Sequence, residues 1–475
     1  MMTLDAYSEV VRNDLETLGF GAPSWVQSRD GVYDVVIVGG GQSGMGAAFG
    51  LMRERVSNLL IIDENAPGNE GPWGTYARMI TLRTPKHLTS IDLGVPSLTF
   101  RAYWVAQYGQ DSWDAIDKIP REDWLDYLKW YREVLDLPVQ NHTRLTEISP
   151  RENGVYSLNV STPDGPQTLK ARNVILATGI QGGGEWHTPD FIKSSLPKTR
   201  YAHTSETIPY EQMQGQKIAI LGNGASSFDN AQHALNAGVG SVAVFCRRSE
   251  IPRVNPIRFM EQSGIVPRFC DLDDALKYQV ISSFMQRAQP PTNDTFTRSA
   301  AWPNFSLHLG APWDTVRDTE RGVEVTTPKG TFLFDFLVLS TGLVTDHTLR
   351  PELTRVADKI ACWRDVYDAP EDQKTPILDA HPYLSEGFEF TPLTPADGPA
   401  IKGLYAFNYS ALVSMGLSAA ALTGLGYAIP RLAQSVASQL FLEDKSDWVQ
   451  KYLDYDEVEF VSEWTPSQER AAVSS

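Results

Sequence analysis

Residues 33–65 read YDVVIVGGGQSGMGAAFGLMRERVSNLLIIDEN, and this stretch decides the fold. It contains an apolar run, a glycine-rich turn, an alanine-rich stretch and a second apolar run that ends at Asp63. Short apolar runs bounded by turn residues are typical of buried strands, and the alanine-rich stretch favours a helix. The order strand, turn, helix, strand predicts a dinucleotide-binding unit.

Each glycine of this turn has a physical task. Gly39 permits a tight turn, Gly41 lets the backbone approach a pyrophosphate, and Gly44 lets the helix pack closely on the strand. The pyrophosphate would rest on the helix N-terminus, where Ser43 lies. The alternative is a glycine-rich turn between strand and helix that binds no ligand.

An acidic pair follows the second strand of this unit. Asp63 lies nineteen residues after Gly44, where a carboxylate accepts hydrogen bonds from ribose hydroxyls, and Glu64 follows it. With both strands, the helix and the acid in place, we expect this unit to bind a nucleotide.

A second unit of the same kind begins near residue 216. The run QKIAIL precedes GNGASS at 222–227, and a helical stretch then leads to SVAVF at 241–245. Gly222 and Gly224 repeat the first two glycines of the pattern. Ser227 replaces the third, and a small residue there still allows close packing.

The acid of the first unit has no counterpart in the second. Cys246 stands at the matching position, and Arg247 and Arg248 follow it. Two guanidinium groups would attract a ribose 2′-phosphate that a carboxylate would repel, so this site is expected to prefer NADPH over NADH. The alternative is a solvated basic strand end.

Two further apolar runs end in Thr-Gly, NVILATGI at 173–180 and DFLVLSTGL at 335–343. Gly179 and Gly342 would let the chain pass close to a bound nucleotide. The order of these runs predicts that the second unit is inserted into the first domain, with the chain leaving near 205 and returning near 335. The expected fold is α/β, with two Rossmann-like dinucleotide-binding domains. The expected ranges are 1–31 for an N-terminal helical extension, 32–205 and 335–442 for the first domain, 206–334 for the second, and 443–475 for a tail.

Composition restricts the partners. The 475 residues carry a formal net charge of −17 and a pI near 5.0, which argues against nonspecific binding to nucleic acid or anionic membranes. Residues 411–442 are apolar but interrupted by glycines and by Pro430, so a buried helix is expected, with contact to a membrane surface as the alternative.

Neither a metal site nor a disulfide framework is expected. Cys246, Cys270 and Cys362 are far apart, and the eight histidines show no spacing typical of a metal site. The N-terminus lacks the basic start and apolar core of a signal peptide. Reduced thiols and a cytoplasmic location are expected.

The order GGGQSG, ATG, GNGASS and STG resembles the two-dinucleotide-binding-domain flavoproteins, and within them the class B flavin-containing and N-hydroxylating monooxygenases. The resemblance covers most of residues 32–440. It implies FAD at the first site and NADPH at the second.

Local matches narrow this resemblance. GPWGTYARMITLRTPKHL looks like the monooxygenase segment in which a Trp lies near the isoalloxazine and a Pro-Lys follows, here Trp73, Pro85 and Lys86. The segment 119–131 is similar to the next helix of those enzymes. Its Trp124, Leu128 and Tyr131 have the spacing of a buried helical face.

The sequence also departs from the family. Arg83 stands where relatives often have an Asn near the reactive edge of the flavin. The Baeyer-Villiger fingerprint is only faintly present around His203, which lowers the expectation of ketone oxygenation. No redox-active cysteine pair is present, which argues against the disulfide reductases of the same architecture.

The resemblance implies that NADPH reduces FAD, that O₂ adds to give a C4a-hydroperoxide, and that a substrate nitrogen or sulfur attacks it. Arg83 and Lys86 are the candidate catalytic residues at the flavin edge, with structural salt bridging as the alternative. A helix is expected to start near 414–418 and to point its N-terminus at the flavin, with Gly416 allowing the approach. A core helix with an incidental glycine is the alternative.

The leading function is therefore an NADPH-dependent FAD monooxygenase that N-hydroxylates a small amine. Because Arg83 and Lys86 would favour an anion, the amine is expected to carry an acidic group. The alternatives are an S-oxygenase, an NADPH-linked flavin oxidase or dehydrogenase, and a flavin-bearing sensor. The expected partners are the small-molecule substrate and O₂, and a homo-oligomer is left open. Residues 463–475 are expected to fray.

Overall fold

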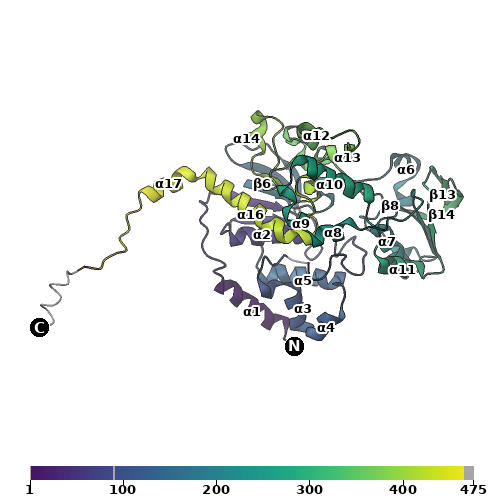
Figure 1. Ribbon diagram of the computed structural model, residues 1–475, viewed down its shortest axis with the longest axis horizontal. Helices are drawn as coiled ribbons and strands as arrows, with labels where there is room; N and C mark the ends of the chain where they lie inside the picture. The colour runs from purple at the N-terminus through teal and green to yellow at the C-terminus, as the bar shows by residue number, and fades with distance from the viewer. Residues whose placement is uncertain (1, 89–90, 465–475) are drawn as a thin grey trace.

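A computed structural model describes residues 2–88 and 91–464. It contains two sheet-based domains, with the second, around β8, β13 and β14, at the end of the molecule opposite α17 (Figure 1). The first sheet has the order β3-β2-β1-β6-β5-β4, and β17 pairs with β6. Its strands are β1 Tyr33–Val38, β2 Leu59–Ile62, β3 Val139–Gln140, β4 Arg144–Ile148, β5 Tyr156–Thr162, β6 Gly165–Leu176 and β17 Leu404–Ala406.

The second sheet has the order β11-β10-β9-β15-β8, and all its neighbouring strands are parallel. Its strands are β8 Tyr201–His203, β9 Lys217–Leu221, β10 Ser241–Phe245, β11 Phe305–His308 and β15 Phe336–Leu339. An antiparallel sheet of β12 Thr315–Thr319, β13 Gly322–Thr327 and β14 Gly330–Phe334 adjoins it. The α/β fold with two dinucleotide-binding domains is thus confirmed.

The insertion is also present, but the expected boundaries at 205 and 335 are wrong. Strand β15, expected in the first domain, pairs with β9 and with β8 in the second sheet. The chain crosses between the domains at β7 Gly184–Trp186 and β16 Leu343–Thr345, which pair with each other, and it rejoins the first sheet at β17. A short apolar run shows that a strand exists but not which sheet it joins.

Helix α2, Gln42–Arg53, packs on the long helix α16, Leu422–Glu443. Two glycines of α2 permit the close approach. A Cβ on Gly46 would lie 2.5 Å from Ile429 Cδ1, and one on Gly50 would lie 2.7 Å from Ile429 Cγ2. The glycines of α2 therefore serve its packing on α16, in addition to those that form the nucleotide turn.

A group of helices near the N-terminus contributes a cluster of aromatic side chains to the core of the first domain. It is built from α1 Leu4–Thr17, η1 Pro96–Leu98, α3 Phe100–Tyr108, α4 Gln110–Ala115 and α5 Arg121–Val134. The predicted face of α5 is confirmed, since Trp124, Leu128 and Tyr131 are all buried. The N-terminal extension belongs to this core because Tyr7 stacks on Trp130.

The remaining helices lie between and around the sheets. They are α6 Asp190–Ser195, α7 Ala225–Asn236, α8 Pro256–Gln262, α9 Ile265–Arg268, α10 Asp274–Arg287, α11 Asn293–Ala300, α12 Trp363–Val366, α13 Pro376–Asp379, α14 Gly398–Ile401 and α15 Leu412–Met415. Helix α10 leaves the second domain and packs on α15, where Tyr278 and Trp363 are buried in a shared cluster. The inserted segment and the first domain therefore share this hydrophobic cluster.

The helix expected to start near 414–418 begins later. Helix α15 ends at Met415, its C-cap Gly416 has a left-handed φ of 68°, and α16 begins at Leu422. A left-handed residue terminates a helix, so the chain forms a loop at 416–421 instead. No helix among the described residues is long and apolar enough to cross a membrane.

The C-terminal segment extends from the body as an arm (Figure 1). The end of α16 is fixed by the fully buried Arg172, which pairs with Glu443 at 3.0 Å and Asp444 at 2.9 Å. Helix α17, Lys445–Leu453, then buries none of its residues. The expected tail at 443–475 thus starts with helix. The residues expected to fray, 463–475, lie outside the described residues except for 463–464.

Candidate dinucleotide sites

The first turn joins β1 to α2 as the sequence predicts. Gly39 has a φ of 108°, and a Cβ there would lie 2.5 Å from Ala177 O at the end of β6. A Cβ on Gly44 would lie 1.8 Å from Gly39 O, so no larger residue fits. Gly41 is the N-cap of α2, and a Cβ there would approach only the backbone of Gly71, at 3.6 Å. The turn is tight on the protein side and open at the helix N-terminus.

Asp63 lies directly behind this turn. Its carboxylate accepts from Gly40 N at 2.7 Å and from Asn65 N at 2.8 Å. Burial raises the pKa of Asp63, while these hydrogen bonds lower it. A carboxylate has about four acceptor positions, so capacity for a ribose hydroxyl remains. Glu64 is exposed, 3.5 Å from Arg144, and its predicted contact with the ribose stays a prediction.

The loop before α16 reaches the same helix N-terminus. Ser43 Oγ donates to Ala419 O at 2.8 Å, so residues 416–421 lie beside the first turn. A Cβ on Gly416 would lie 2.6 Å from the Phe269 ring, so this glycine serves packing. Its predicted contact with the flavin stays a prediction, but no helix N-terminus lies at Gly416.

Trp73 is also connected to the first turn. Its indole donates to Gln42 Oε1 at 3.2 Å, and the indole of Trp124 donates to the same oxygen at 3.2 Å. Gln42 is the first residue of α2. With its oxygen bound by two indoles, the Gln42 amide NH₂ is fixed beside the helix N-terminus.

The second turn repeats the geometry of the first. Gly222 has a φ of 129°, and a Cβ there would lie 2.4 Å from Ser340 O at the end of β15. Gly224 is the N-cap of α7, and a Cβ there would meet nothing within 4 Å. Asn223 Nδ2 and Ser227 Oγ are buried and have no hydrogen-bond partner among the described residues. Buried polar atoms without partners are rare, so this cradle fits a ligand with acceptors and donors.

The strand end after the second turn is neutral and then basic. Burial raises the pKa of Cys246 to about 12, so its thiol is uncharged. Arg247 is exposed, and Arg248 donates to Gln286 O at 3.1 Å. Both guanidinium groups stay without a carboxylate partner among the described residues. They follow the strand β10 of the second turn unit, and their contact with the 2′-phosphate of NADPH stays a prediction.

The two Thr-Gly ends each accompany one turn. Gly179 follows β6 beside the first turn, and Gly342 follows β15 beside the second. Both are left-handed, with φ of 72° and 79°, and a Cβ on either would meet nothing within 4 Å. Their predicted nucleotide contacts stay predictions.

The structure does not bring Arg83 and Lys86 together as free cations. Arg83 Nη2 pairs with Asp229 Oδ2 of α7. Lys86 Nζ donates to Trp113 O and to Ile116 O, both at 2.7 Å, and lies 4.6 Å from the Trp113 ring centre. Each cation therefore has protein partners, a salt bridge for Arg83 and two backbone carbonyl groups for Lys86. Their catalytic roles stay predictions.

Sequence reasoning missed three residues that contact these sites: Gln42, Arg78 and Asp229. Arg78 donates to Thr204 O at 2.9 Å and to Glu206 O at 2.8 Å, across the domain boundary. Asp229 has one sequence signal, because it lies beside the apolar face of α7 at Phe228 and Ala231. An acid there needs a partner.

The chain matches known proteins over most of its length. A family model described as pyridine nucleotide-disulphide oxidoreductase matches residues 36–259. All three cysteines of this chain are nevertheless free and buried. The FAD-dependent urate hydroxylase of Xanthomonas campestris pv. campestris is 57% identical over 468 residues, covering 98% of both chains.

Solved structures resemble the fold. The ornithine hydroxylase of Pseudomonas aeruginosa superimposes with a TM-score of 0.69 at 16% identity, covering 86% of this chain and 100% of that one. The L-lysine 6-monooxygenase of Pseudomonas syringae gives a TM-score of 0.64 at 16% identity, covering 86% and 99%. At this identity the likeness concerns the fold alone. Together with the near full-length match above, the two dinucleotide turns identify the chain as a member of the flavin-dependent monooxygenase family that contains the Xanthomonas FAD-dependent urate hydroxylase.

Proposed function

We propose that this protein is an NADPH-dependent FAD monooxygenase that hydroxylates urate. The observation that carries the proposal is the 57% identity to a FAD-dependent urate hydroxylase over 468 residues, which are 98% of this chain. Function resides in sites rather than folds, so this identity weighs more than the likeness to the N-hydroxylases.

The first turn would hold FAD. The open α2 N-terminus at Gly41 would receive the pyrophosphate, and Asp63 would receive the ribose. Trp73, which is 8% exposed, and the fixed Gln42 amide would restrict water at that end of the site. Bound FAD would supply the redox centre that accepts a hydride from NADPH and activates O₂.

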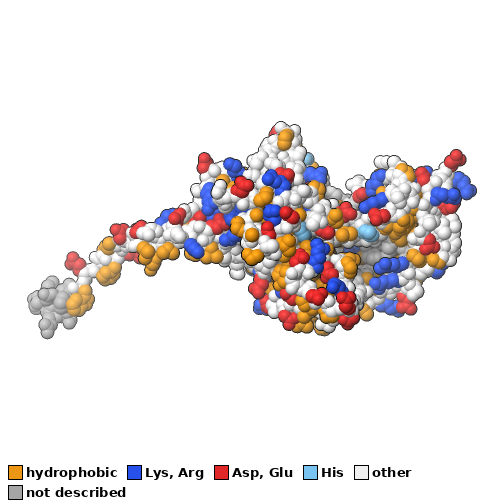
Figure 2. Space-filling model, turned by 90° about the horizontal axis from the view of Figure 1, so that it is seen from above, with side chains coloured by type: hydrophobic (Ala, Val, Ile, Leu, Met, Phe, Trp, Pro, Cys, Tyr) orange, Lys and Arg blue, Asp and Glu red, His pale blue; other side chains and the backbone are white. Residues whose placement is uncertain are grey.

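The second turn would hold NADPH. Gly224 leaves the N-terminus of α7 open, and the unpartnered Asn223 and Ser227 atoms would donate to or accept from the coenzyme. Arg247 and Arg248 would bind the 2′-phosphate. Figure 2 shows Lys and Arg side chains near the hollow between the first domain and the second, consistent with a bound anion there.

The N-hydroxylation of an acidic amine loses part of its basis. That prediction needed Arg83 and Lys86 as free cations, and both have protein partners. Amine hydroxylation, S-oxygenation and simple flavin oxidase activity are therefore kept as outcomes of the test and not as a second proposal.

The test is a substrate screen with the purified FAD-loaded protein. NADPH consumption, O₂ uptake and substrate loss are measured with urate, xanthine, ornithine, lysine and a thioether, and catalase reports any released peroxide. We expect urate loss to match NADPH loss. Turnover of ornithine or lysine instead would support N-hydroxylation, turnover of the thioether would support S-oxygenation, and peroxide without product would support an oxidase.

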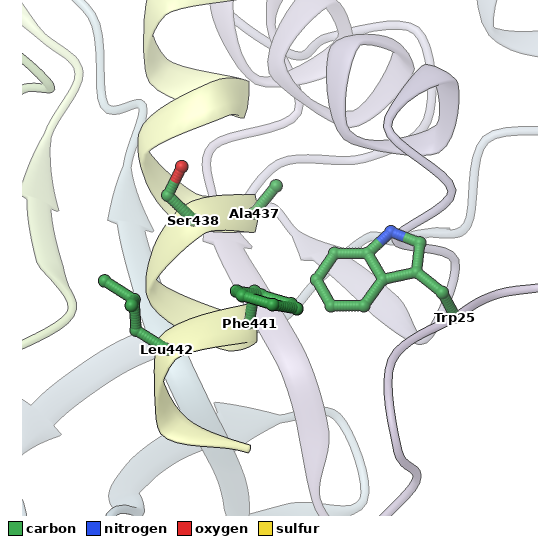
Figure 3. A pocket seen from close by; sticks show the side chains of 5 residues that line it. All are labelled: Trp25, Ala437, Ser438, Phe441 and Leu442. Carbon is green, nitrogen blue, oxygen red and sulfur yellow. The ribbon is translucent and has the colours of Figure 1, made fainter. Parts of the chain in front are cut away.

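A homo-oligomer also stays a prediction, and the C-terminal arm supports it. Ten large hydrophobic side chains between 441 and 464 are exposed, among them Tyr452, Phe460 and Trp464. At the base of the arm, Trp25 faces Phe441 beside Leu442 in an open apolar groove (Figure 3). A second copy covering this arm would remove the exposed surface from water. Light scattering of the full chain and of a chain ending at Asp444 tests this. The cytoplasmic location likewise stays a prediction.

A further inference from the structure

One loop of the first domain contacts the helices of both dinucleotide turns. At its start, Trp73 donates to Gln42 at the N-terminus of α2, and Arg121 donates to Trp73 O. At its end, Arg83 pairs with Asp229 of α7, five residues after the N-cap Gly224. The eleven residues 73–83 thus connect the N-terminus of α2 with the second turn of α7.

The loop comprises residues 73–83. In its middle, Arg78 makes a second connection to α7. Besides its bonds to the 204 and 206 carbonyl groups, Arg78 lies 5.5 Å from the Tyr210 ring centre. Tyr210 Oη donates to Asn230 Oδ1 at 2.9 Å, and Asn230 is the neighbour of Asp229. Arg258 of α8 also donates to Arg83 O at 3.1 Å. The loop is therefore attached to the second domain at several points.

The Arg83–Asp229 pair is asymmetric in its exposure. The Asp229 side chain is 5% exposed, whereas that of Arg83 is 35% exposed. Removing Arg83 would leave a buried carboxylate without its charge partner, which is strongly unfavourable. Removing the charge of Asp229 would leave a cation that water can still reach. The buried carboxylate of Asp229 therefore needs Arg83 as its charge partner, and the ion pair between them holds α7 against the loop.

We propose that residues 73–83 set the position of the NADPH-binding helix α7 relative to the FAD-binding helix α2, with Arg83 acting as a positioning residue through Asp229. The inference rests on the proposed cofactors but not on urate as the substrate. It differs from the sequence-based role of Arg83, which placed its charge at the reactive edge of the flavin.

The physical consequence lies in hydride transfer. With FAD on the first turn and NADPH on the second, different domains would hold the two cofactors, and an error of about 1 Å in such an alignment costs on the order of a hundredfold in rate. The affinity of each nucleotide for its own turn would change less, because the turn itself is built within one domain. A lesion in the pair should therefore lower the rate of flavin reduction while each cofactor still binds.

The test compares Asp229→Asn and Arg83→Lys with a control, Arg355→Gln, which removes an ion pair between Arg355 and Glu147 within the first domain. Asp229→Asn keeps the shape and leaves only the partly exposed cation. Flavin content, the anaerobic rate of reduction by NADPH and the rate of reoxidation by O₂ after dithionite reduction are measured. We expect full flavin content, unchanged reoxidation and about ten- to hundredfold slower reduction in Asp229→Asn.

A measurement without coenzyme makes the test independent of turnover. Hydrogen exchange of the FAD-loaded protein should rise in 73–83 and 204–206 of Asp229→Asn but not in α2, β1 or the control. Unchanged exchange together with unchanged reduction would overturn the proposal. Normal reduction with loss of hydroxylated product would place Arg83 at the substrate. A wild-type flavin that NADPH does not reduce would overturn the proposed function, and the exchange result would then decide the inference alone.

Discussion

The two dinucleotide turns share their first two glycines and differ at the third position and at the strand end. Gly39 and Gly222 each approach a carbonyl group at the end of the neighbouring parallel strand, at Ala177 after β6 and at Ser340 after β15. The third position differs because Gly44 has no room for a side chain, whereas Ser227 is buried with its hydroxyl unpartnered. Two turns with the same backbone arrangement thus accept different residues at the third position. How closely the helix packs on the turn determines whether a side chain fits there.

The strand ends differ in charge. Asp63 places a carboxylate behind the first turn, with Gly40 N as a donor. Cys246 places an uncharged thiol behind the second, 3.8 Å from Gly222 O. An acid suits ribose hydroxyls, and a neutral position followed by arginines suits a 2′-phosphate. The same fold unit can therefore serve two coenzymes through one position.

Exchanging the third residues of the two turns should have the largest effect. Gly44→Ser should destabilise the first domain by about 3 kcal/mol or more, because its Cβ would lie 1.8 Å from Gly39 O. Ser227→Gly should cost roughly 1 kcal/mol or less, from added backbone freedom in α7. Denaturant unfolding and flavin content measure both variants. A stable, fully yellow Gly44→Ser protein would contradict the packing difference.

Blocking the open second position should separate the two cofactors. Gly41→Val should fold but lose FAD, since the protein leaves space there and the pyrophosphate needs it. Gly224→Val should keep FAD, and NADPH should reduce it about a hundredfold more slowly. Flavin stoichiometry and anaerobic reduction distinguish them. If Gly41→Val stays yellow, the assignment of FAD to the first turn fails.

Removing the two arginines should affect one coenzyme selectively. Arg247→Ala with Arg248→Ala should weaken NADPH by about 1.5 to 3 kcal/mol more than NADH, the range of a charged hydrogen bond. The matched control is Arg321→Ala, an exposed arginine in the β12–β13 turn. Dissociation constants from flavin absorbance changes measure the difference. Equal losses for both coenzymes would remove the basis for NADPH preference.

The smallest effect concerns Cys246. Because burial raises its pKa to about 12, the thiol stays protonated as pH rises from 6 to 9, and no charge develops behind the second turn. Alkylation of native Cys246 should therefore be slow throughout this range and become fast after unfolding. Mass spectrometry of iodoacetamide-treated protein measures it, with Cys362 as a second buried thiol of raised pKa, about 11. Rapid native labelling at pH 8 would show a charged strand end.

Local patterns were sufficient for both turns and for one helix face. The glycines at 39, 41 and 44 act on neighbours close in the chain, and Trp124, Leu128 and Tyr131 follow the period of a single helix. The start of α16 was misplaced because the apolar run continues through Gly416, and only the left-handed backbone there ends α15. Composition does not report that conformation.

These local patterns could not predict contacts between residues that are distant in the chain. The residues of strand β15 are as apolar as those of β6, and pairing with β9 rather than β6 depends on the assembled sheet. Lys86 was expected at the flavin edge, but its ammonium meets two carbonyl groups at the end of α4, which no spacing in the sequence indicates.

By itself, the sequence determined that the chain has two dinucleotide turns, which of them has an acid and which has arginines, and that one unit is inserted in the other. The two turns and their strand ends depend on residues within about thirty positions of each other, where glycine geometry and strand or helix periodicity act directly. The insertion was inferred from the order of the units along the chain, although the run at 335–343 was assigned to the wrong sheet. Only the tertiary structure decided where the chain crosses from one domain to the other and which carboxylate Arg83 pairs with. Its partner Asp229 is 146 residues away, and a buried carboxylate selects its cation by position in space.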